Sequence, residues 1–255
     1  MPVNFNTQLP TGFPTPPNPT LNQYAFPNDL TTGNSGSGAK GSGKSYWAGN
    51  YMRKFNKLFP KSPIYLLSNK KLKDEPAFEG VKNITQLPLN EEVLSEIIGR
   101  KLEKKGKKKV YDEDYEDEKD ELVDNNNSAH ERFKSKTGQS LVVFDDFEGS
   151  ELEKLIRLII DNITSVGRSS RIYSLIISHV LCNGKSTKMV LSEADCYVLY
   201  PRGISPYHIK YCLKNYTRLN EKQISKIIDS NSRWIFIKRS GQTNYVIEEH
   251  RLWMF

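Results

Sequence analysis

One stretch of glycine, lysine and serine has the residue types and spacing of a phosphate-binding loop. Glycines allow successive backbone N–H groups to point into one concavity that holds phosphate oxygens. Lys44 would reach the β- and γ-phosphates of ATP, and the Ser45 hydroxyl would bind Mg²⁺. The G-x-x-x-x-G-K-S pattern occurs once, as Gly38, Ala39, Lys40, Gly41, Ser42, Gly43, Lys44 and Ser45.

A flexible linker is the alternative interpretation of the same residues. Residues 33–45 are rich in glycine and serine, so a linker there can match the pattern by chance. An apolar strand usually leads into a phosphate-binding loop, but residues 28–32 are mostly polar. A second motif is therefore needed to favour nucleotide binding.

That second motif lies at the end of an apolar run. Residues 141–144 are Leu-Val-Val-Phe, and Asp145 and Asp146 follow them directly. Such a run predicts a buried parallel strand. Asp145 would lie near Mg²⁺, and Asp146 would orient or activate the water that attacks the γ-phosphate. The distance along the chain from Lys44 leaves room for one or two strand–helix units, so the two motifs together predict an ATPase site.

A third candidate is the apolar run of residues 172–177, which arginines precede and polar residues follow. A polar residue after the run would sense the γ-phosphate from a neighbouring strand. Arg168 or Arg171, before the run, would point into the site of a neighbouring subunit and stabilise charge in the transition state. The alternative is that these arginines only solvate the start of a strand, and the residues do not choose between the two interpretations.

Helical and strand patterns alternate around these motifs. Alternation of this kind predicts an α/β fold with a mainly parallel sheet flanked by helices. Apolar residues at helical spacing predict helices over residues 45–59, 90–98, 152–163, 207–213 and 221–229. Short apolar runs predict strands over residues 64–67, 141–144, 172–177 and 196–200, with a pair over 233–238 and 244–248 joined through Gly241.

Two segments have the composition of chain that does not fold by itself. Residues 1–30 hold seven of the 13 prolines, which predicts an extended arm, disordered or wrapped on a partner. Residues 101–135 contain a lysine run followed by an acidic run, which predicts a disordered charged insertion. The lysine run could also form a loop that binds DNA, or act as a localisation signal. We expect residues 31–255 to form one domain around this insertion.

The positive charge is concentrated near the end of the sequence. The 255 residues have a net charge of +7, and residues 201–255 alone hold ten basic and four acidic residues. A basic surface of this kind favours a polyanion such as nucleic acid. The alternative is an ordinary solvated surface.

Several classes of protein are disfavoured. Three cysteines without a C-x-x-C pair argue against a disulfide framework. No apolar run approaches the roughly 20 residues that span a bilayer, so we expect no membrane insertion. The first residues lack the features of a signal peptide, so we expect a protein that is not secreted. A zinc site is disfavoured by the irregular spacing of His179, Cys182, Cys196, His208 and Cys212.

Four stretches together resemble the genome-packaging ATPases of nucleocytoplasmic large DNA viruses, virophages and polinton-like elements. The resemblance covers about residues 30–220, and its most specific parts are Ile-Ser-His at 177–179 and Glu-Ala-Asp followed by Pro-Arg-Gly within 193–203. The other two stretches are residues 38–45 and 141–146. This family belongs to the FtsK–HerA superfamily of DNA-translocating ATPases.

The resemblance implies a RecA-like P-loop NTPase core that works on double-stranded DNA as a ring, usually a hexamer or pentamer. It also implies a setting in an infected host cell and capsid proteins as partners. Lys44 and Ser45 would then hold the Walker A roles and Asp145 and Asp146 the Walker B roles. Ser178 and His179 would occupy the sensor position, and an arginine at the start of the Ile172 strand would act on the neighbouring subunit. The chain departs from the pattern at Asp146, where relatives in the wider superfamily often carry the longer glutamate.

Two further functions are compatible with these features. A cellular translocase or helicase of the same superfamily would share the chemistry and differ in its setting. A non-catalytic module that binds DNA or a capsid would use the glycine-rich stretch as a linker and residues 201–255 as its binding surface. Stabilisation of the protein by ATP and Mg²⁺ would distinguish an ATPase from this module.

Overall fold

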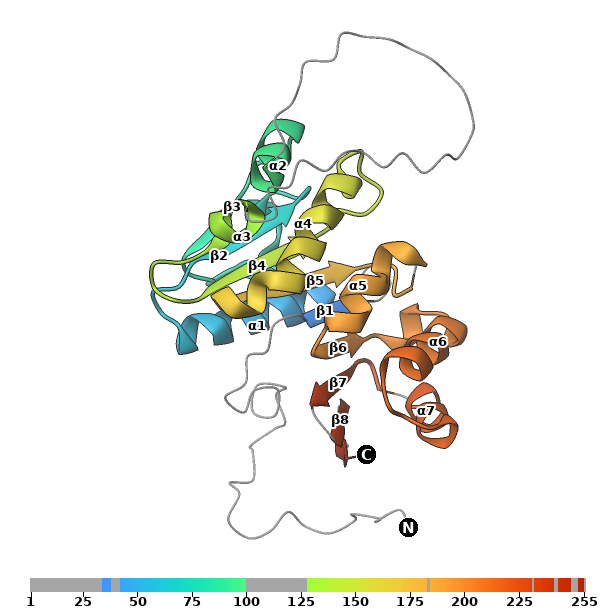
Figure 1. Cartoon of the computed structure of the whole chain (residues 1–255). Coiled ribbons are helices and arrows are strands. Elements are labelled where there is room, and N and C mark those ends of the chain that lie inside the picture. Colours follow the sequence, from blue (N-terminus) through green and yellow to red (C-terminus); the bar gives the residue numbers. More distant parts are fainter. Residues whose placement is uncertain are drawn as a thin grey trace, which may run out of the picture.

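The computed structural model describes residues 34–37, 42–99, 128–182, 184–230, 232–240, 243–248 and 252–254. One nine-stranded sheet runs through them in the order β3-β2-β4-β5-β1-β6-β7-β8-β9 (Figure 1). The strands from β3 to β6 in this order pair in parallel, and β7, β8 and β9 add antiparallel. Their bounds are β1 Asn34–Ser37, β2 Ile64–Ser68, β3 Ile84–Gln86, β4 Ser140–Asp145, β5 Ile172–Ser178, β6 Cys196–Leu199, β7 Ile235–Ser240, β8 Thr243–Glu248 and β9 Leu252–Met254.

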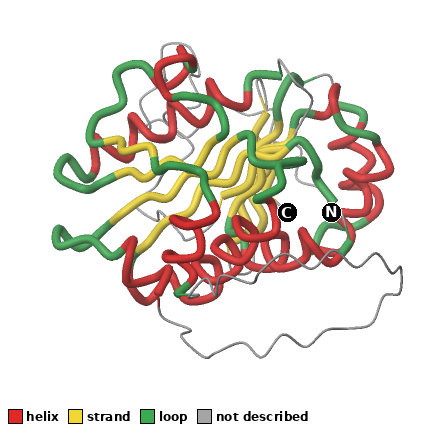
Figure 2. The backbone as a smooth tube through the Cα atoms, turned by 90° about the horizontal axis from the view of Figure 1, so that it is seen from above, coloured by secondary structure: helices red, strands yellow, loops and turns green. Residues whose placement is uncertain are grey.

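Helices cover both faces of this sheet (Figure 2). Helix α1 packs on one face, and α2 to α7 lie on the other. Short 3₁₀ turns, η1 Leu72–Asp74, η2 Pro76–Phe78, η3 Gly167–Ser170 and η4 Pro201–Gly203, join some of the elements. The helices are α1 Lys44–Leu58, α2 Glu91–Ile98, α3 Ser128–Phe133, α4 Glu153–Val166, α5 Lys185–Glu193, α6 Pro206–Tyr216 and α7 Glu221–Ile228.

Successive side chains of the buried strands pack on opposite faces of the sheet. In β4, Leu141 and Val143 pack with α1, whereas Val142 and Phe144 pack with α2, α3 and α4. All four side chains are completely buried, because helices cover the strand on both sides. This packing explains why the run is continuously apolar, and it fixes the position of the two aspartates that follow.

Helix α1 lies close to the backbone of η2. A Cβ atom at Gly49 would lie 1.9 Å from the carbonyl oxygen of Ala77, a separation that no side chain tolerates. Arg53, one turn later, donates hydrogen bonds from Nη1 to the carbonyl oxygens of Ala77 and Glu79 at 3.0 and 2.9 Å. Gly49 thus permits the close approach, and Arg53 stabilises it.

The predicted α/β fold with a mainly parallel sheet is confirmed. Every predicted helix and strand has a counterpart within a few residues, and the helix predicted to start after Asn90 is α2, where the Asn90 side chain accepts a hydrogen bond from Val93 N at 2.8 Å. The patterns did not indicate β1, β3, α3, α5 or β9. Strand β1 was missed because its sequence, Asn-Ser-Gly-Ser, has no apolar residue.

The predicted arm, residues 1–30, lies outside the described residues, as do residues 101–127 of the charged insertion. Residues 128–133, which the prediction included in that insertion, form α3. Ala129 and Phe133 of this helix are buried against the same core as α4. The insertion was therefore predicted to end too late, because charged residues between Ala129 and Phe133 masked a short buried face.

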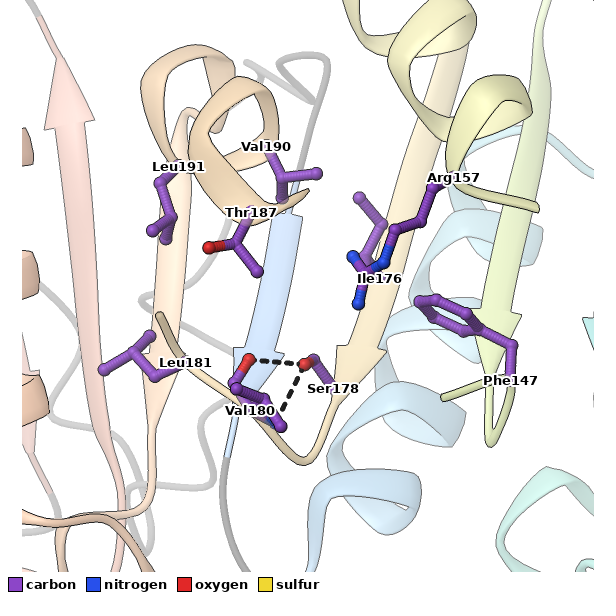
Figure 3. Close-up of a pocket in the computed structure, with 9 residues that line it drawn as sticks. All are labelled: Phe147, Arg157, Ile176, Ser178, Val180, Leu181, Thr187, Val190 and Leu191. Atoms are coloured by element: carbon purple, nitrogen blue, oxygen red, sulfur yellow. Dashed lines mark hydrogen bonds between the residues drawn. The ribbon is translucent and has the colours of Figure 1, made fainter. Parts of the chain in front are cut away.

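Between α4, β5 and α5 lies a cavity of about 20 Å³ (Figure 3). Ligand pockets are typically hundreds of Å³ in volume, so this cavity is too small for a substrate. Its polar side chains include Arg157 and Ser178, and the second of these ends strand β5. In the part of the chain that the structure describes, no helix is long and apolar enough to cross a membrane.

Candidate functional site

Lys44 and Ser45 form the first turn of α1, directly after the glycine-rich stretch. Gly43 caps the helix in the left-handed conformation, with φ of 103°, which glycine adopts without strain. Lys44 is buried, with 7% of its surface exposed, and Ser45 is partly exposed. The backbone N–H groups of this first turn and the helix dipole make this end of α1 suited to an anion. Gly38, Ala39, Lys40 and Gly41 lie outside the described residues.

Two side chains donate hydrogen bonds to the backbone carbonyl oxygens directly before this turn. Tyr200, after β6, donates its hydroxyl to the carbonyl oxygen of Gly43 at 3.2 Å. Arg233, before β7, donates from Nε to the carbonyl oxygen of Ser42 at 3.2 Å. The C=O and N–H groups of one peptide point in opposite directions. Because these side chains bind the carbonyl oxygens, the N–H groups of the same peptides point away from them. Neither contact was predicted from the sequence. Tyr200 lies in the 193–203 stretch, which gives no sign of this contact, and Arg233 belongs to no motif.

The two aspartates lie at the carboxyl end of β4. Asp145 is 6% exposed, whereas the side chain of Asp146 is 56% exposed. Burial, followed by the negative charge of Asp146, raises the pKa of Asp145 to about 6. Asp146 has a left-handed backbone, with φ of 49°, and its carbonyl oxygen accepts a hydrogen bond from Asn69 Nδ2 at 2.8 Å. Asp146 therefore turns out of the strand toward solvent.

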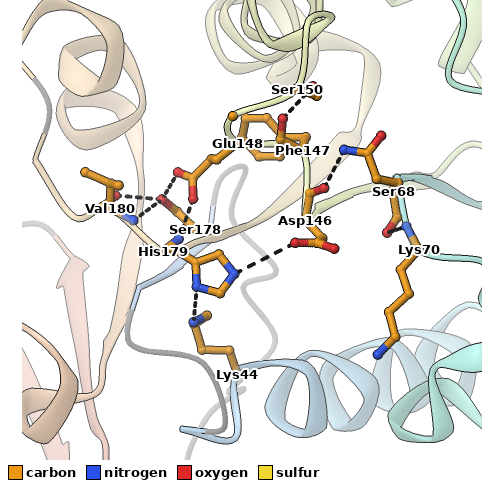
Figure 4. A network of polar contacts seen from close by, with 12 residues as sticks. Lys44, Ser68, Lys70, Asp146, Phe147, Glu148, Ser150, Ser178, His179 and Val180 are labelled. Atoms are coloured by element: carbon orange, nitrogen blue, oxygen red, sulfur yellow. Dashed lines mark hydrogen bonds and ion pairs between the residues drawn. The ribbon is translucent and has the colours of Figure 1, made fainter.

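Strand order explains how these groups meet. Strand β5 pairs with both β1 and β4, so the end of β5 lies between the glycine-rich stretch and the aspartates. His179 is the first residue after β5. Its Nδ1 lies 3.3 Å from Lys44 Nζ, and its Nε2 lies 4.0 Å from Asp146 Oδ1 (Figure 4). The structure thus brings together four of the predicted site residues, Lys44, Asp145, Asp146 and His179.

The contact with Lys44 defines the tautomer of His179. A lysine ammonium group only donates hydrogen bonds, so Nδ1 of His179 accepts from it. In the neutral ring the proton is then on Nε2, which faces the Asp146 carboxylate. Burial lowers the pKa of Lys44, while Asp145, Glu148 and Asp146 act in the opposite direction. A cation, an imidazole and carboxylates therefore converge at one edge of the sheet.

Glu148 was not among the predicted site residues. It follows Asp146 by two positions, and its carboxylate accepts hydrogen bonds from the Ser178 hydroxyl and, at 2.6 Å, from His179 N (Figure 4). The only sequence signal was its closeness to Asp145 and Asp146. Glu148 connects the loop after β4 to the end of β5.

Arg168 and Arg171 lie far from this site. Arg171 precedes β5, and Arg168 lies in η3 just before it. The strand has seven residues, so its two ends are separated by about 20 Å at about 3.3 Å per residue. The Arg171 side chain is exposed, and its backbone is left-handed, with φ of 56°. Within one subunit, Arg171 therefore does not contribute to the site around Lys44.

The predicted basic surface of residues 201–255 is partly engaged inside the molecule. Arg239 donates from Nη1 to the carbonyl oxygens of Leu191, Ser192 and Ala194 at 2.8, 3.1 and 3.0 Å, so it caps the end of α5. Arg233 bonds the glycine-rich stretch. Exposed basic residues remain on α6 and α7 and in the loop between them, namely Lys210, Lys214, Arg218, Lys222 and Lys226.

The oxygen donors near Lys44 fit Mg²⁺ better than zinc. Among the described residues, no group of three or more histidine, cysteine or acidic side chains could hold a metal ion. Mg²⁺ usually takes one or two carboxylates and completes its shell with phosphate oxygens and water. The Ser45 hydroxyl and the Asp145 carboxylate supply that limited set.

Comparison with solved structures identifies the fold. The genome-packaging NTPase B204 of Sulfolobus turreted icosahedral virus 2, in complex with AMP, matches 86% of this chain and 98% of its own, with a TM-score of 0.52 and 10% sequence identity. This chain has the fold of a viral packaging NTPase. The predicted RecA-like P-loop NTPase core is thereby confirmed, as is the resemblance to packaging ATPases at the level of the fold.

Two further comparisons found similar viral proteins. The uncharacterized protein V3 of the Sputnik virophage is 27% identical over 209 residues, which are 80% of this chain and 69% of that protein. The DNA-packaging ATPase B204 of Sulfolobus turreted icosahedral virus covers 84% of this chain and 96% of its own, with 18% identity and a TM-score of 0.47. No protein-family model matches the chain.

Proposed function

We propose that this protein is an ATP-hydrolysing motor that moves double-stranded DNA into a viral capsid. The observation that carries the proposal is the meeting of Lys44, Asp145, Asp146 and His179 at one edge of a P-loop NTPase fold. The fold of a viral packaging NTPase and the similarity to a virophage protein support the viral setting, in an infected host cell. A non-catalytic module would have no need for two buried side chains of opposite charge, Lys44 and Asp145, that are close enough to interact electrostatically.

Hydrolysis would proceed by in-line attack of water on the γ-phosphate. The N–H groups at the start of α1 and the Lys44 ammonium would bind the phosphates and stabilise the charge that develops on them. Asp146, whose carboxylate is exposed at the site, would accept a proton from the water or orient it. His179, which lies between Lys44 and Asp146, would contact the γ-phosphate. Ser45 and Asp145 would hold Mg²⁺, which supplies charge neutralisation at the phosphates.

A ring would complete the site. Arg171 is exposed at the end of β5 opposite His179, where its guanidinium cannot reach the phosphates of its own subunit. In a hexamer or pentamer, Arg171 or Arg168 would enter the site of the next subunit and stabilise charge in the transition state. Assembly and hydrolysis would then be coupled.

The exposed lysines and arginine of α6, α7 and their connection would contact the DNA phosphates. Contacts of this kind weaken steeply with salt, because each one releases counterions from the DNA. Capsid proteins would be the second partner. The proposed organisation is an arm over residues 1–30 and one ATPase domain over 31–255, interrupted by the charged insertion.

The proposal is tested with the full chain, linear double-stranded DNA and Mg²⁺–ATP. We expect DNA to stimulate ATP hydrolysis and ATP to drive displacement of a triplex-forming oligonucleotide from the duplex. Particle-size measurements with DNA and ATP should show a ring. ATP hydrolysis without triplex displacement would contradict the motor and leave an NTPase of another role.

A melting curve separates the motor from the non-catalytic module. ATP with Mg²⁺ should raise the melting temperature, because a ligand that binds only the folded state stabilises it. Lys44→Ala should lose this rise. An unchanged melting temperature at millimolar ATP would favour the module.

A further inference from the structure

We propose that Glu148 is a positioning residue for ATP hydrolysis, which fixes the end of β5 and thereby holds His179 between Lys44 and Asp146. The inference rests on the proposed function, since it concerns the rate of the same site. Glu148 has no role in any of the predicted motifs. Its contacts link the loop that carries Asp145 and Asp146 to the strand that carries His179.

Both oxygens of the Glu148 carboxylate are used. Oε1 accepts a hydrogen bond from the Ser178 hydroxyl, and Oε2 accepts one from the backbone N–H of His179 at 2.6 Å (Figure 4). Ser178 Oγ in turn accepts from Val180 N at 3.1 Å, so it bridges the chain on either side of His179. The carbonyl oxygen of Val180, at 2.6 Å, is a second acceptor that shares the one hydroxyl proton of Ser178 with Glu148. Hydrogen bonds to an ionised acceptor are stronger than neutral ones. One side chain therefore fixes two successive residues at the end of β5.

The charge of Glu148 is supported from α4. Arg157 Nη2 lies 3.8 Å from Glu148 Oε1 and 2.8 Å from Glu153 Oε1. The Arg157 guanidinium also lies 5.5 Å from the centre of the Phe147 ring. Only 12% of the Glu148 side chain is exposed, so an opposite charge nearby reduces the cost of burying the carboxylate. Arg157 and Ser178 both line the small cavity between α4, β5 and α5 (Figure 3).

These contacts distinguish Glu148 from Asp146. The Asp146 side chain is 56% exposed, and it faces the His179 ring at 4.0 Å. The Glu148 oxygens are directed to the backbone N–H and the hydroxyl at the end of β5. Asp146 is therefore the carboxylate that would meet water, and Glu148 acts through the residues it holds.

The effect of losing Glu148 follows from the geometry around His179. The imidazole has one nitrogen 3.3 Å from Lys44 and the other 4.0 Å from Asp146. A displacement of about 1 Å at a reacting group costs about 100-fold in rate. Release of the His179 backbone should therefore slow hydrolysis. It should leave nucleotide binding in place, because the hydrogen bonds of Glu148 go to the end of β5 and its charge acts on Lys44 less strongly than that of Asp145.

The test compares Glu148→Gln with Glu153→Gln. The glutamine keeps the shape but presents an NH₂ group to one of the two donors. We expect kcat to fall at least tenfold and at most about 100-fold, the loss of rate for a reacting group displaced by about 1 Å. The Kd for ATP should stay within about threefold of the wild-type value. Glu153→Gln removes a neighbouring carboxylate that binds Arg157 and Gly149 N, and it should keep kcat within about twofold.

A spectroscopic measurement tests the same contact without any enzymatic turnover. The chain has four histidines, so ¹⁵N-histidine labelling gives four backbone amide signals. The His179 signal should lie downfield, because its N–H donates to a carboxylate, and should move upfield in Glu148→Gln but not in Glu153→Gln. An unmoved signal would overturn the positioning role whether or not the wild type hydrolyses ATP. A wild type that hydrolyses no ATP would instead contradict the proposed function.

Two kinetic outcomes would also overturn the inference. One is wild-type kcat in Glu148→Gln, and the other is loss of ATP binding together with kcat, which would make Glu148 a structural residue of the whole site. If Glu148→Gln does not fold, Ser178→Ala takes its place, because it removes one of the two donors. Ser178→Ala should lower kcat about fivefold at unchanged Kd, and wild-type kcat in this variant would refute the role.

Discussion

The Nζ atom of Lys44 and the Nδ1 atom of His179 lie 3.3 Å apart, although 135 positions separate the two residues in the sequence. The contact joins the first turn of α1 to the end of β5. It exists because β5 pairs with β1 on one side and with β4 on the other. The same pairing places Asp146 on the opposite side of the imidazole.

Replacement of His179 should slow hydrolysis more than it weakens binding. His179→Ala removes the ring that lies between Lys44 and Asp146, and we expect kcat to fall about 100-fold, as for loss of one polar group at a transition state. His208→Ala, an exposed histidine on α6, is the matched control and should retain kcat. Steady-state phosphate release measures both. Equal rates in the two variants would remove His179 from the site.

Asp146→Asn should separate nucleotide binding from chemistry. Asparagine also tolerates the left-handed backbone of this position, so the fold should persist. Without the carboxylate, hydrolysis should fall at least 100-fold, while ATP still raises the melting temperature. The control is Asp74→Asn, an exposed aspartate of η1. Hydrolysis by Asp146→Asn at the wild-type rate would show that another group handles the water.

Arg233→Ala should weaken ATP binding modestly. The guanidinium holds the Ser42 carbonyl at 3.2 Å, and loss of a hydrogen bond of about 1 kcal/mol corresponds to about fivefold in affinity. Isothermal titration with a non-hydrolysable ATP analogue measures the change. Lys226→Ala removes an equal charge from the exposed side of α7 and should leave the affinity unchanged. The same loss in both variants would point to net charge rather than to the loop.

Gly49→Ala should destabilise the fold. The added methyl group would lie 1.9 Å from the Ala77 carbonyl oxygen, so α1 and η2 must separate. Overpacking of this kind costs about 1–3 kcal/mol, which exceeds the gain in helix propensity of about 1 kcal/mol. Urea denaturation measures the free energy of unfolding. Lys57→Ala, on the exposed surface of the same helix, should change it by less than about 0.5 kcal/mol, and equal stability of the two variants would contradict the close packing.

The motifs with apolar or charged signatures were predictable from the sequence. The apolar run before Asp145 and Asp146 predicted β4, because a strand covered on both faces has no polar position. Strand β1 was not predictable, since Asn-Ser-Gly-Ser carries no pattern and is placed by its backbone pairing with β5 and β6. Helix α5, with Lys185, Ser186 and Thr187 in its first turn, also lacks an apolar start.

The residues of the candidate site likewise fall into those that the sequence indicated and those that it did not. Lys44, Asp145, Asp146 and His179 were identified because each lies at the end of a recognisable strand or loop. Arg233 and Tyr200 were not, because they reach Ser42 and Gly43 only through the packing of the C-terminal strands. Similarly, the charge of residues 201–255 does not show that Arg239 caps α5, which depends on the pairing of β7 with β6.

The most direct measurement is phosphate release from Mg²⁺–ATP by the full chain and by Lys44→Ala. The wild type should hydrolyse ATP, and Lys44→Ala should lower the rate by about 100- to 1,000-fold, because its ammonium group is the buried cation at the start of α1. Lys57→Ala on the same helix should hydrolyse ATP at the wild-type rate. Hydrolysis by folded Lys44→Ala at the wild-type rate would contradict an ATPase site at this edge of the sheet.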